Sequence, residues 1–219
     1  MRITREPPPC RPISHDLQAE RRALQALERR QLQRHSGVEA RYRDMDLRNL
    51  PRWVPAPYRA AAAALLDLLP TPQMVALCGE RGTGKTALAC GAVNAFCAAG
   101  KPAIYLMLLD FFSDLSKAPW DAKDAIWRKY LIPDLLVLDE VQVRSTDREW
   151  QEQELFRLID KRYAAMKATV LISNLAPDAL ADSLGPSITR RLLEEGGAIA
   201  CDWARLLRDQ QQPRMEIVA

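Results

Sequence analysis

The sequence predicts an α/β fold in which a parallel sheet is covered by helices on both faces. Four short, continuously apolar runs have the composition of strands buried on both faces, and they cover residues 74–78, 103–109, 135–138 and 168–172. A weaker fifth run covers residues 198–201. Helix-forming stretches separate these runs, and strands that alternate with helices are typical of parallel sheets.

The first run leads directly into a glycine-rich loop. Residues 79–86 read Gly-x-x-x-x-Gly-Lys-Thr between a strand signal and a helix signal, which is the phosphate-binding P-loop pattern. Glycines allow backbone N–H groups to turn inward around phosphate oxygens. We expect Lys85 to reach the β- and γ-phosphates and Thr86 to bind Mg²⁺. The residues expected to hold the nucleotide are Gly79, Gly82, Thr83, Gly84, Lys85, Thr86 and Ala87.

Polar side chains follow two further strands at the points where those strands end. Asp139 and Glu140 follow the third run, and Asn174 follows the fourth. Because ligands bind at the carboxyl ends of parallel strands, we expect these side chains beside the P-loop. Asp139 would then complete the Mg²⁺ site, and Glu140 would polarise the attacking water from the opposite side of the strand. Asn174 could hold that water or sense the γ-phosphate, although Asn is also common at strand ends for turn reasons.

A basic pair follows the fourth strand signal. Ser187 is expected to cap a short helix that carries Arg190 and Arg191. A guanidinium presented in this way can stabilise the departing γ-phosphate in a neighbouring subunit, which is the arginine-finger role. The alternative is an exposed basic helix without a catalytic role.

The N-terminal region carries the positive charge of the chain. The net charge is +3, yet the first 60 residues hold thirteen arginines against seven acidic residues. Prolines at positions 7–9 and 12 predict an extended lead, and a helix is expected from residue 16 to 34. Its leucines form only a thin apolar stripe among arginines. Such a helix is either a solvated arm or a docking helix for a partner protein or nucleic acid.

Cysteine usage and hydropathy restrict the class of protein. The five cysteines form no Cys-x-x-Cys pair, which disfavours a metal site or a disulfide framework. The longest apolar stretch, residues 60–69, is shorter than the roughly 18 residues that cross a bilayer, and the N-terminus has no signal-peptide core. We therefore expect a cytoplasmic protein.

Five blocks of sequence, in this order, resemble the DnaC-type helicase loaders and the related IstB transposition ATPases of the AAA+ superfamily. They are GERGTGKTALA at 79–89, LVLDEV at 136–141, LIDKRY at 158–163, LISNL at 171–175 and GPSITRRL at 185–192. The resemblance covers about residues 36–208. The linker at 35–43 and the ending at 200–203 look more like the loader branch.

The resemblance implies an AAA+ P-loop NTPase of the ASCE class, a three-layer sandwich around a five-stranded parallel sheet in the order 5-1-4-3-2. It implies that ATP and Mg²⁺ are bound, that Asn174 is the first sensor, and that Arg191 is a finger acting on the next subunit. The expected organisation is a Pro-rich lead, arginine-rich helix and linker (1–50), an ATPase domain (51–208) and a polar tail (209–219). The implied partners are a ring-shaped replicative helicase and single-stranded DNA.

Several positions depart from the families that the chain resembles. Arg81 stands where these families often have proline, and the extension before residue 36 is short. After Trp203 only sixteen residues remain, which is too few for a C-terminal helical lid. We therefore expect slow hydrolysis in the isolated chain, as suits a switch better than a motor.

Residues 110–130 mix aromatic and basic side chains, and in the AAA+ superfamily this region faces the central channel of the assembly. Stacking on DNA bases is therefore plausible here. Phe111, Phe112 and Trp127 are individually more typical of core packing. The basic residues that could contact phosphates, on charge alone, are Lys117, Lys123, Arg128 and Lys129.

Together these features predict an ATP-dependent helicase loader. One alternative is an IstB-like partner of a transposase, which would act on duplex target DNA. Another is an adaptor that binds ATP without hydrolysing it, and the presence of Glu140 and Arg191 argues against this adaptor.

Overall fold

The computed structural model describes residues 15–141 and 148–203. Its sheet has five parallel strands in the order β2-β3-β4-β1-β5. The strands are β1 (Met74–Cys78), β2 (Ala103–Met107), β3 (Leu135–Asp139), β4 (Ala168–Ser173) and β5 (Gly197–Ala200). Read from the other edge, this is the predicted order 5-1-4-3-2, so the predicted sheet is confirmed.

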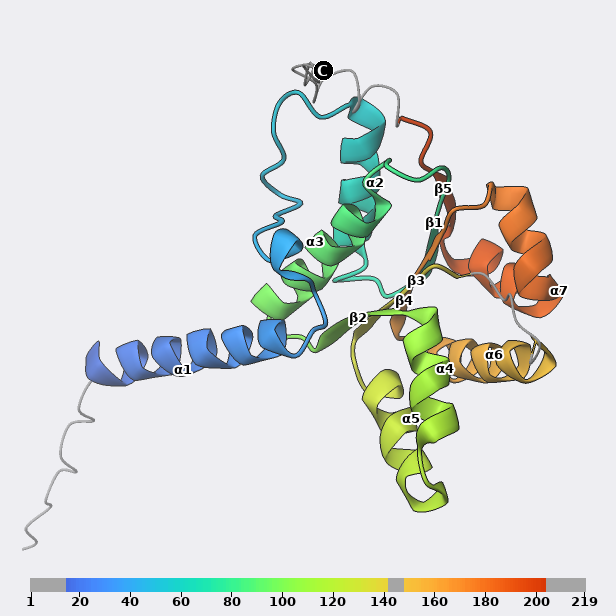
Figure 1. The fold of residues 1–219 in the computed structure, drawn as a ribbon. Coiled ribbons are helices and arrows are strands. Elements are labelled where there is room, and N and C mark those ends of the chain that lie inside the picture. Colours follow the sequence, from blue (N-terminus) through green and yellow to red (C-terminus); the bar gives the residue numbers. More distant parts are fainter. Residues whose placement is uncertain (1–14, 142–147, 204–219) are drawn as a thin grey trace, which may run out of the picture.

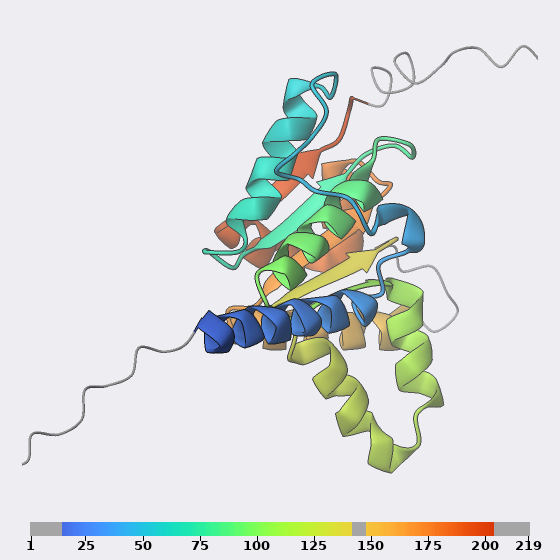
Figure 2. The ribbon, with the colours of Figure 1, turned by 90° about the vertical axis from the view of Figure 1, so that its left-hand side faces the viewer.

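Helices form a layer on each face of the sheet (Figures 1 and 2). One layer contains α2 (Ala56–Asp67) and α3 (Lys85–Ala98), which pack on alternate strand residues such as Val75 and Leu77. The other contains α4 (Leu108–Lys117), α5 (Lys123–Leu131), α6 (Arg148–Ala164) and α7 (Pro177–Glu195), which pack on the intervening residues such as Ala76. Because both faces are covered, β1, β3 and β4 are buried at every position rather than at alternate ones. In the described part of the chain, no helix is long and apolar enough to cross a membrane.

Two local expectations are corrected. The second strand ends at Met107 rather than at residue 109, and α4 begins directly at Leu108. Ser187 does not cap a helix, because the helical conformation of α7 is interrupted earlier, at Gly185, whose φ of 76° and ψ of 165° are not helical. Pro186 follows this interruption. Proline suits the first position of a helix, because it has no backbone N–H that would be left without an acceptor. The Pro-rich lead, the polar tail and the expected lack of a lid concern residues outside those described.

The arm, α1 (His15–Arg34), extends beyond the body of the domain (Figure 1). Leu17, Leu24 and Leu27 are 51%, 57% and 53% exposed, whereas Leu32, near the end of α1, packs against the core. The segment that follows α1 contains the short 3-10 helix η1 (Ala40–Tyr42) and is anchored on the domain by buried Val38 and Leu47 on either side of it. The arm is therefore attached to the domain mainly through its last turns.

Candidate nucleotide-binding site

The loop between β1 and α3 has the backbone of a phosphate cradle. Gly79, Gly82 and Gly84 have φ values of 129°, 83° and 86°, which residues with a Cβ rarely adopt. A Cβ at Gly84 would also lie 2.9 Å from the Tyr58 ring. Gly84 is the N-cap of α3 and has no side chain to bond the first N–H groups of that helix. These N–H groups and the helix dipole favour an anion at this point.

Lys85 lies inside the loop. Its Nζ donates hydrogen bonds to the carbonyl oxygens of Gly79 and Glu80 at 2.7 and 2.8 Å. Burial lowers the pKa of Lys85 below its ordinary value. A charged phosphate oxygen is a stronger acceptor than these carbonyls, so the position suits a lysine that binds phosphate.

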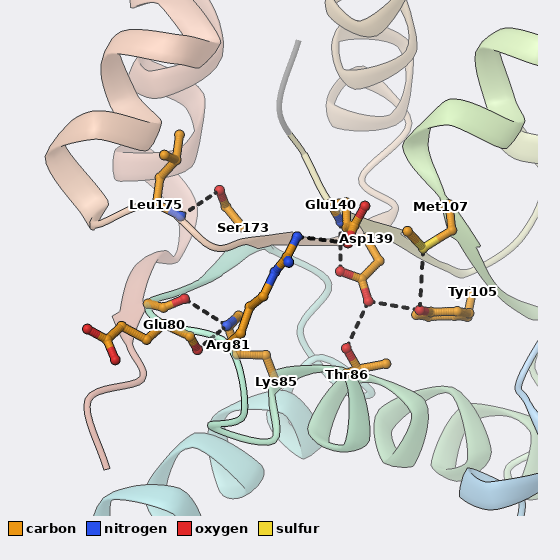
Figure 3. A network of polar contacts seen from close by, with 11 residues as sticks. Glu80, Arg81, Lys85, Thr86, Tyr105, Met107, Asp139, Glu140, Ser173 and Leu175 are labelled. Carbon is orange, nitrogen blue, oxygen red and sulfur yellow. Dashed lines mark hydrogen bonds and ion pairs between the residues drawn. The ribbon is translucent and has the colours of Figure 1, made fainter. Parts of the chain in front are cut away.

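Thr86 and Asp139 meet beside the loop (Figure 3). The Thr86 hydroxyl donates to Asp139 Oδ2 at 2.9 Å, and the Tyr105 hydroxyl donates to the same oxygen at 2.8 Å. Asp139 Oδ1 accepts a 2.7 Å hydrogen bond from the Glu140 N–H. Carboxylate and hydroxyl oxygens are the ligands that Mg²⁺ prefers. The donor set therefore fits the Mg²⁺ ion that accompanies a bound nucleotide.

Glu140 lies just past the end of β3 in a left-handed conformation, with φ 54°. Non-glycine residues in this conformation are strained and are concentrated at functional sites. The turn brings Glu140 and Asp139 to one cavity rather than to opposite faces of the sheet. Arg81 approaches Glu140 at 3.8 Å, and because both side chains are well exposed, the pair contributes little stability.

A cavity of about 480 Å³ unites most of the predicted residues. The predicted residues that line it are Gly82, Gly84, Lys85, Thr86, Ala87, Asp139, Glu140 and Asn174. Gly79 and Thr83 support the loop from outside the lining. Thr83 is buried, its hydroxyl donates to the Glu80 carbonyl at 3.2 Å, and its carbonyl accepts a 2.8 Å hydrogen bond from Trp203 Nε1.

Comparison with known proteins identifies the family. A family model described as "IstB-like ATP binding protein" matches residues 18–193. The chain belongs to this family. The chain is 30% identical over 124 residues to the uncharacterized protein YdaV of Escherichia coli (strain K12). The matched segment covers 56% of this chain and 50% of YdaV. The chain thus spans about half the length of this curated relative.

Several solved structures share the fold of the IstB-like chain. The DnaC helicase loader superimposes with a TM-score of 0.62 at 22% identity, covering 74% of this chain and 99% of DnaC. AMPPCP-bound DnaA from Aquifex aeolicus gives 0.63 at 23% identity, covering 78% and 54%. DnaI gives 0.63 at 14% identity, covering 78% and 96%. The predicted resemblance to DnaC and IstB ATPases is therefore confirmed.

Arg191 of the IstB-like chain does not lie in the cavity. Its side chain, 15% exposed, pairs with Asp160 on α6 and donates to the Ser187 carbonyl at 3.1 Å. The guanidinium also lies over the rings of Phe156 and Tyr163, at 5.1 and 5.4 Å from their centroids. Since the chain does not bring Arg191 to its own nucleotide site, a finger role would have to be exercised on another subunit.

The helices α4 and α5 project from the body of the domain (Figure 1). Some aromatic side chains of this segment are buried and one is exposed. Phe111, Phe112 and Trp127 are buried, so they are unavailable for stacking on DNA bases. Trp120, in the 3-10 turn η2 (Trp120–Ala122) between α4 and α5, is 87% exposed, and Lys123 Nζ lies 5.9 Å from its ring centroid. The aromatic candidate for DNA contact is therefore Trp120.

Sequence reasoning missed several residues at the cavity. Glu39, Arg41 and Tyr42 line it from the linker after α1, and no local pattern indicates this. Tyr105 also lines it, from β2. A tyrosine in an otherwise aliphatic strand is a usable signal, because a buried hydroxyl requires a hydrogen-bond partner.

Proposed function

We propose that this chain is an ATP-dependent helicase loader that binds ATP with Mg²⁺ and hydrolyses it to ADP and phosphate. The supporting observation is the convergence of the P-loop, the Thr86–Asp139 contact and Glu140 on one cavity. When bound, Mg²⁺ neutralises charge on the β- and γ-phosphate oxygens. Lys85 would bind the phosphates, Asn174 would orient the attacking water, and Glu140 would accept its proton.

The proposed site is completed by a neighbouring subunit. Arg191 would leave Asp160 and stabilise the charge that develops on the γ-phosphate of the next subunit. An isolated chain would then hydrolyse slowly, and assembly side by side would accelerate it. Turnover would thereby report assembly, which is the property of a switch.

The proposed partners are a replicative hexameric helicase and single-stranded DNA. Helix α1 would grip the helicase, because it presents half-exposed leucines among arginines away from the ATPase domain. Trp120 and Lys123 would contact DNA, since an exposed aromatic beside a cation suits a stacked base and its phosphate. The likeness to the DnaC helicase loader supports the fold on which this proposal rests.

An IstB-like role is the second candidate, and the family match favours it. The partner would then be a transposase, and the DNA would be a duplex target. Co-purification separates the two candidates, because one predicts a hexameric helicase and the other a recombinase with target DNA. Light scattering after size exclusion, with and without ATP, DNA and a candidate helicase, would measure the complex formed.

The central experiment compares ATP turnover by the wild-type chain and by Glu140→Gln, with single-stranded or duplex DNA present. Removal of a general base lowers turnover by about 10²–10⁴-fold, while ATP binding should persist because Lys85 and Thr86 remain. Equal turnover in the two proteins would favour the adaptor that does not hydrolyse ATP. Stimulation by duplex DNA alone would favour the IstB-like role.

A further inference from the structure

Tyr105 on β2 contacts Asp139 at the end of β3, beside the proposed Mg²⁺ ligands (Figure 3). It belongs to β2, where its Cα pairs with Val137, two residues before Asp139 on β3. From this position its hydroxyl reaches along the sheet and donates to Asp139 Oδ2 at 2.8 Å. A phenol hydroxyl carries its proton at neutral pH, so it acts as a donor to this carboxylate.

Asp139 is held from three directions. Thr86 and Tyr105 donate to Oδ2, and the Glu140 N–H donates to Oδ1. A hydroxyl oxygen keeps lone pairs when it donates its proton, so Thr86 could bind a metal and Asp139 at the same time. The Tyr105 hydroxyl also lies 3.9 Å from Met107 Sδ, but a thioether sulfur is a weak acceptor, so Asp139 is its stronger partner. Tyr105 therefore fixes the carboxylate from the β2 side of the site.

Tyr105 is itself held by the junction between the arm and the domain. Its N–H donates a 2.7 Å hydrogen bond to the Ser36 carbonyl, and Ser36 is fully buried. Gly37, with φ 76°, passes so close that a Cβ there would lie 2.2 Å from the Tyr105 carbonyl oxygen. Because β2 is an edge strand, this junction covers a backbone edge that would otherwise be unpaired. The side chain of Tyr105 thus projects from a fixed point.

We propose that Tyr105 is a positioning residue that orients the Asp139 carboxylate for the binding of Mg²⁺ with ATP. The inference rests on the proposed binding of ATP and Mg²⁺ at this cavity. Residues that orient metal ligands by hydrogen bonds affect metal affinity without contacting the metal. A tyrosine that merely satisfied its own hydroxyl would affect folding, and it would leave the Mg²⁺ requirement unchanged.

The test is the Tyr105→Phe variant, titrated with a fluorescent ATP analogue at a series of Mg²⁺ concentrations and in EDTA. We expect the Mg²⁺ concentration that gives half-maximal enhancement of binding to rise about tenfold. Analogue affinity in EDTA and the thermal midpoint should stay close to those of the wild-type chain. Tyr130→Phe is the matched control, because Tyr130 is also buried and donates to an aspartate, Asp114, away from the cavity.

A double-mutant cycle shows whether Tyr105 acts through Asp139. In an Asp139→Asn background, Tyr105→Phe should no longer change the Mg²⁺ requirement. An undiminished effect in that background would overturn the inference, as would an unchanged Mg²⁺ requirement in the single variant. Equal losses with Mg²⁺ and in EDTA, or loss of folding, would assign Tyr105 a structural role instead. A wild-type chain that binds the analogue but ignores Mg²⁺ would overturn the positioning role and the Mg²⁺ site, while the proposed binding of ATP would stand. A wild-type chain that binds no analogue would overturn the proposed function as well.

Discussion

The nucleotide site and the arm differ in how the chain supports them. At the site, Lys85, Thr86 and Asp139 each have hydrogen-bond partners within the same chain. In the arm, the three leucines before the last two turns of α1 are about half exposed. The site is therefore preformed in a single chain, whereas the arm presents apolar surface that its own domain does not cover.

Energetics explain the contrast. Helix α3, which begins at the P-loop, buries ten of its fourteen residues and is stabilised by the core. Helix α1 has twenty residues, and only its C-terminal end packs on the domain. Fully burying a leucine contributes about 1.5–3 kcal/mol. A partner that covered the exposed leucines could thus gain several kcal/mol, which the domain itself leaves unused.

The largest expected effect concerns Arg191. In Arg191→Ala, ATP turnover of the assembled protein should fall about 1000-fold, because the charge that stabilises the γ-phosphate in trans is removed. Nucleotide affinity should change little, since Arg191 lies outside the cavity. Steady-state turnover as a function of protein concentration, combined with analogue binding, measures both quantities.

Arg190→Ala is the control for this variant, because Arg190 lies on the same helix and pairs with the exposed Glu194. Turnover should be retained in Arg190→Ala. A fall in Arg190→Ala with normal turnover in Arg191→Ala would assign the finger to Arg190. That result would also confine Arg191 to its internal pairing with Asp160.

The next effect tests the preformed site. Lys85→Ala should weaken binding of the ATP analogue about 100-fold, because the ion pair between the Lys85 ammonium and the bound phosphates would be lost. Lys101→Ala is a matched control, since Lys101 also donates to a main-chain carbonyl, that of Leu69, but outside the cavity. Fluorescence titration of both variants makes the comparison. Undiminished uptake by Lys85→Ala would contradict the phosphate-binding assignment.

A smaller effect tests the junction between the two regions. Gly37→Ala should lower the free energy of unfolding by about 2 kcal/mol, because it combines a positive φ with a close approach to the Tyr105 carbonyl. Gly100→Ala should cost only about 1 kcal/mol, since Gly100 has φ 75° but open space at the Cβ position. Chemical denaturation of the two variants measures the difference. Equal losses would mean that the close approach contributes nothing.

Local sequence patterns predicted the sheet and most of the site because their causes are local. An apolar run, a glycine loop and a polar strand end each reflect backbone requirements of a few adjacent residues. The topology of parallel strands then places Asp139 beside Thr86, 53 residues away. The order of the strands followed from the family resemblance rather than from these patterns.

Long-range contacts could not be predicted in this way. The contact of Tyr105 with Asp139 depends on strand register, and the pairing of Arg191 with Asp160 depends on the packing of α7 on α6. Hydropathy also fails to distinguish exposed Trp120 from buried Trp127, because the two side chains are chemically identical. In each case the tertiary structure, and not the local sequence, determines which residues come into contact or are buried.

The smallest effect separates a docking helix from a solvated arm. Replacing Leu24 and Leu27 by Asp should leave the thermal midpoint nearly unchanged, because surface substitutions usually alter stability by less than about 0.5 kcal/mol. The same change should weaken binding to a replicative helicase at least about tenfold, since an apolar contact of roughly 1.4 kcal/mol or more would be lost. Leu32→Asp is the contrasting variant, because Leu32 packs on the core and its replacement should lower stability. Helicase affinity that is unaffected by the double change would mean that α1 is solvated in the complex, and the partner would then have to contact the ATPase domain itself.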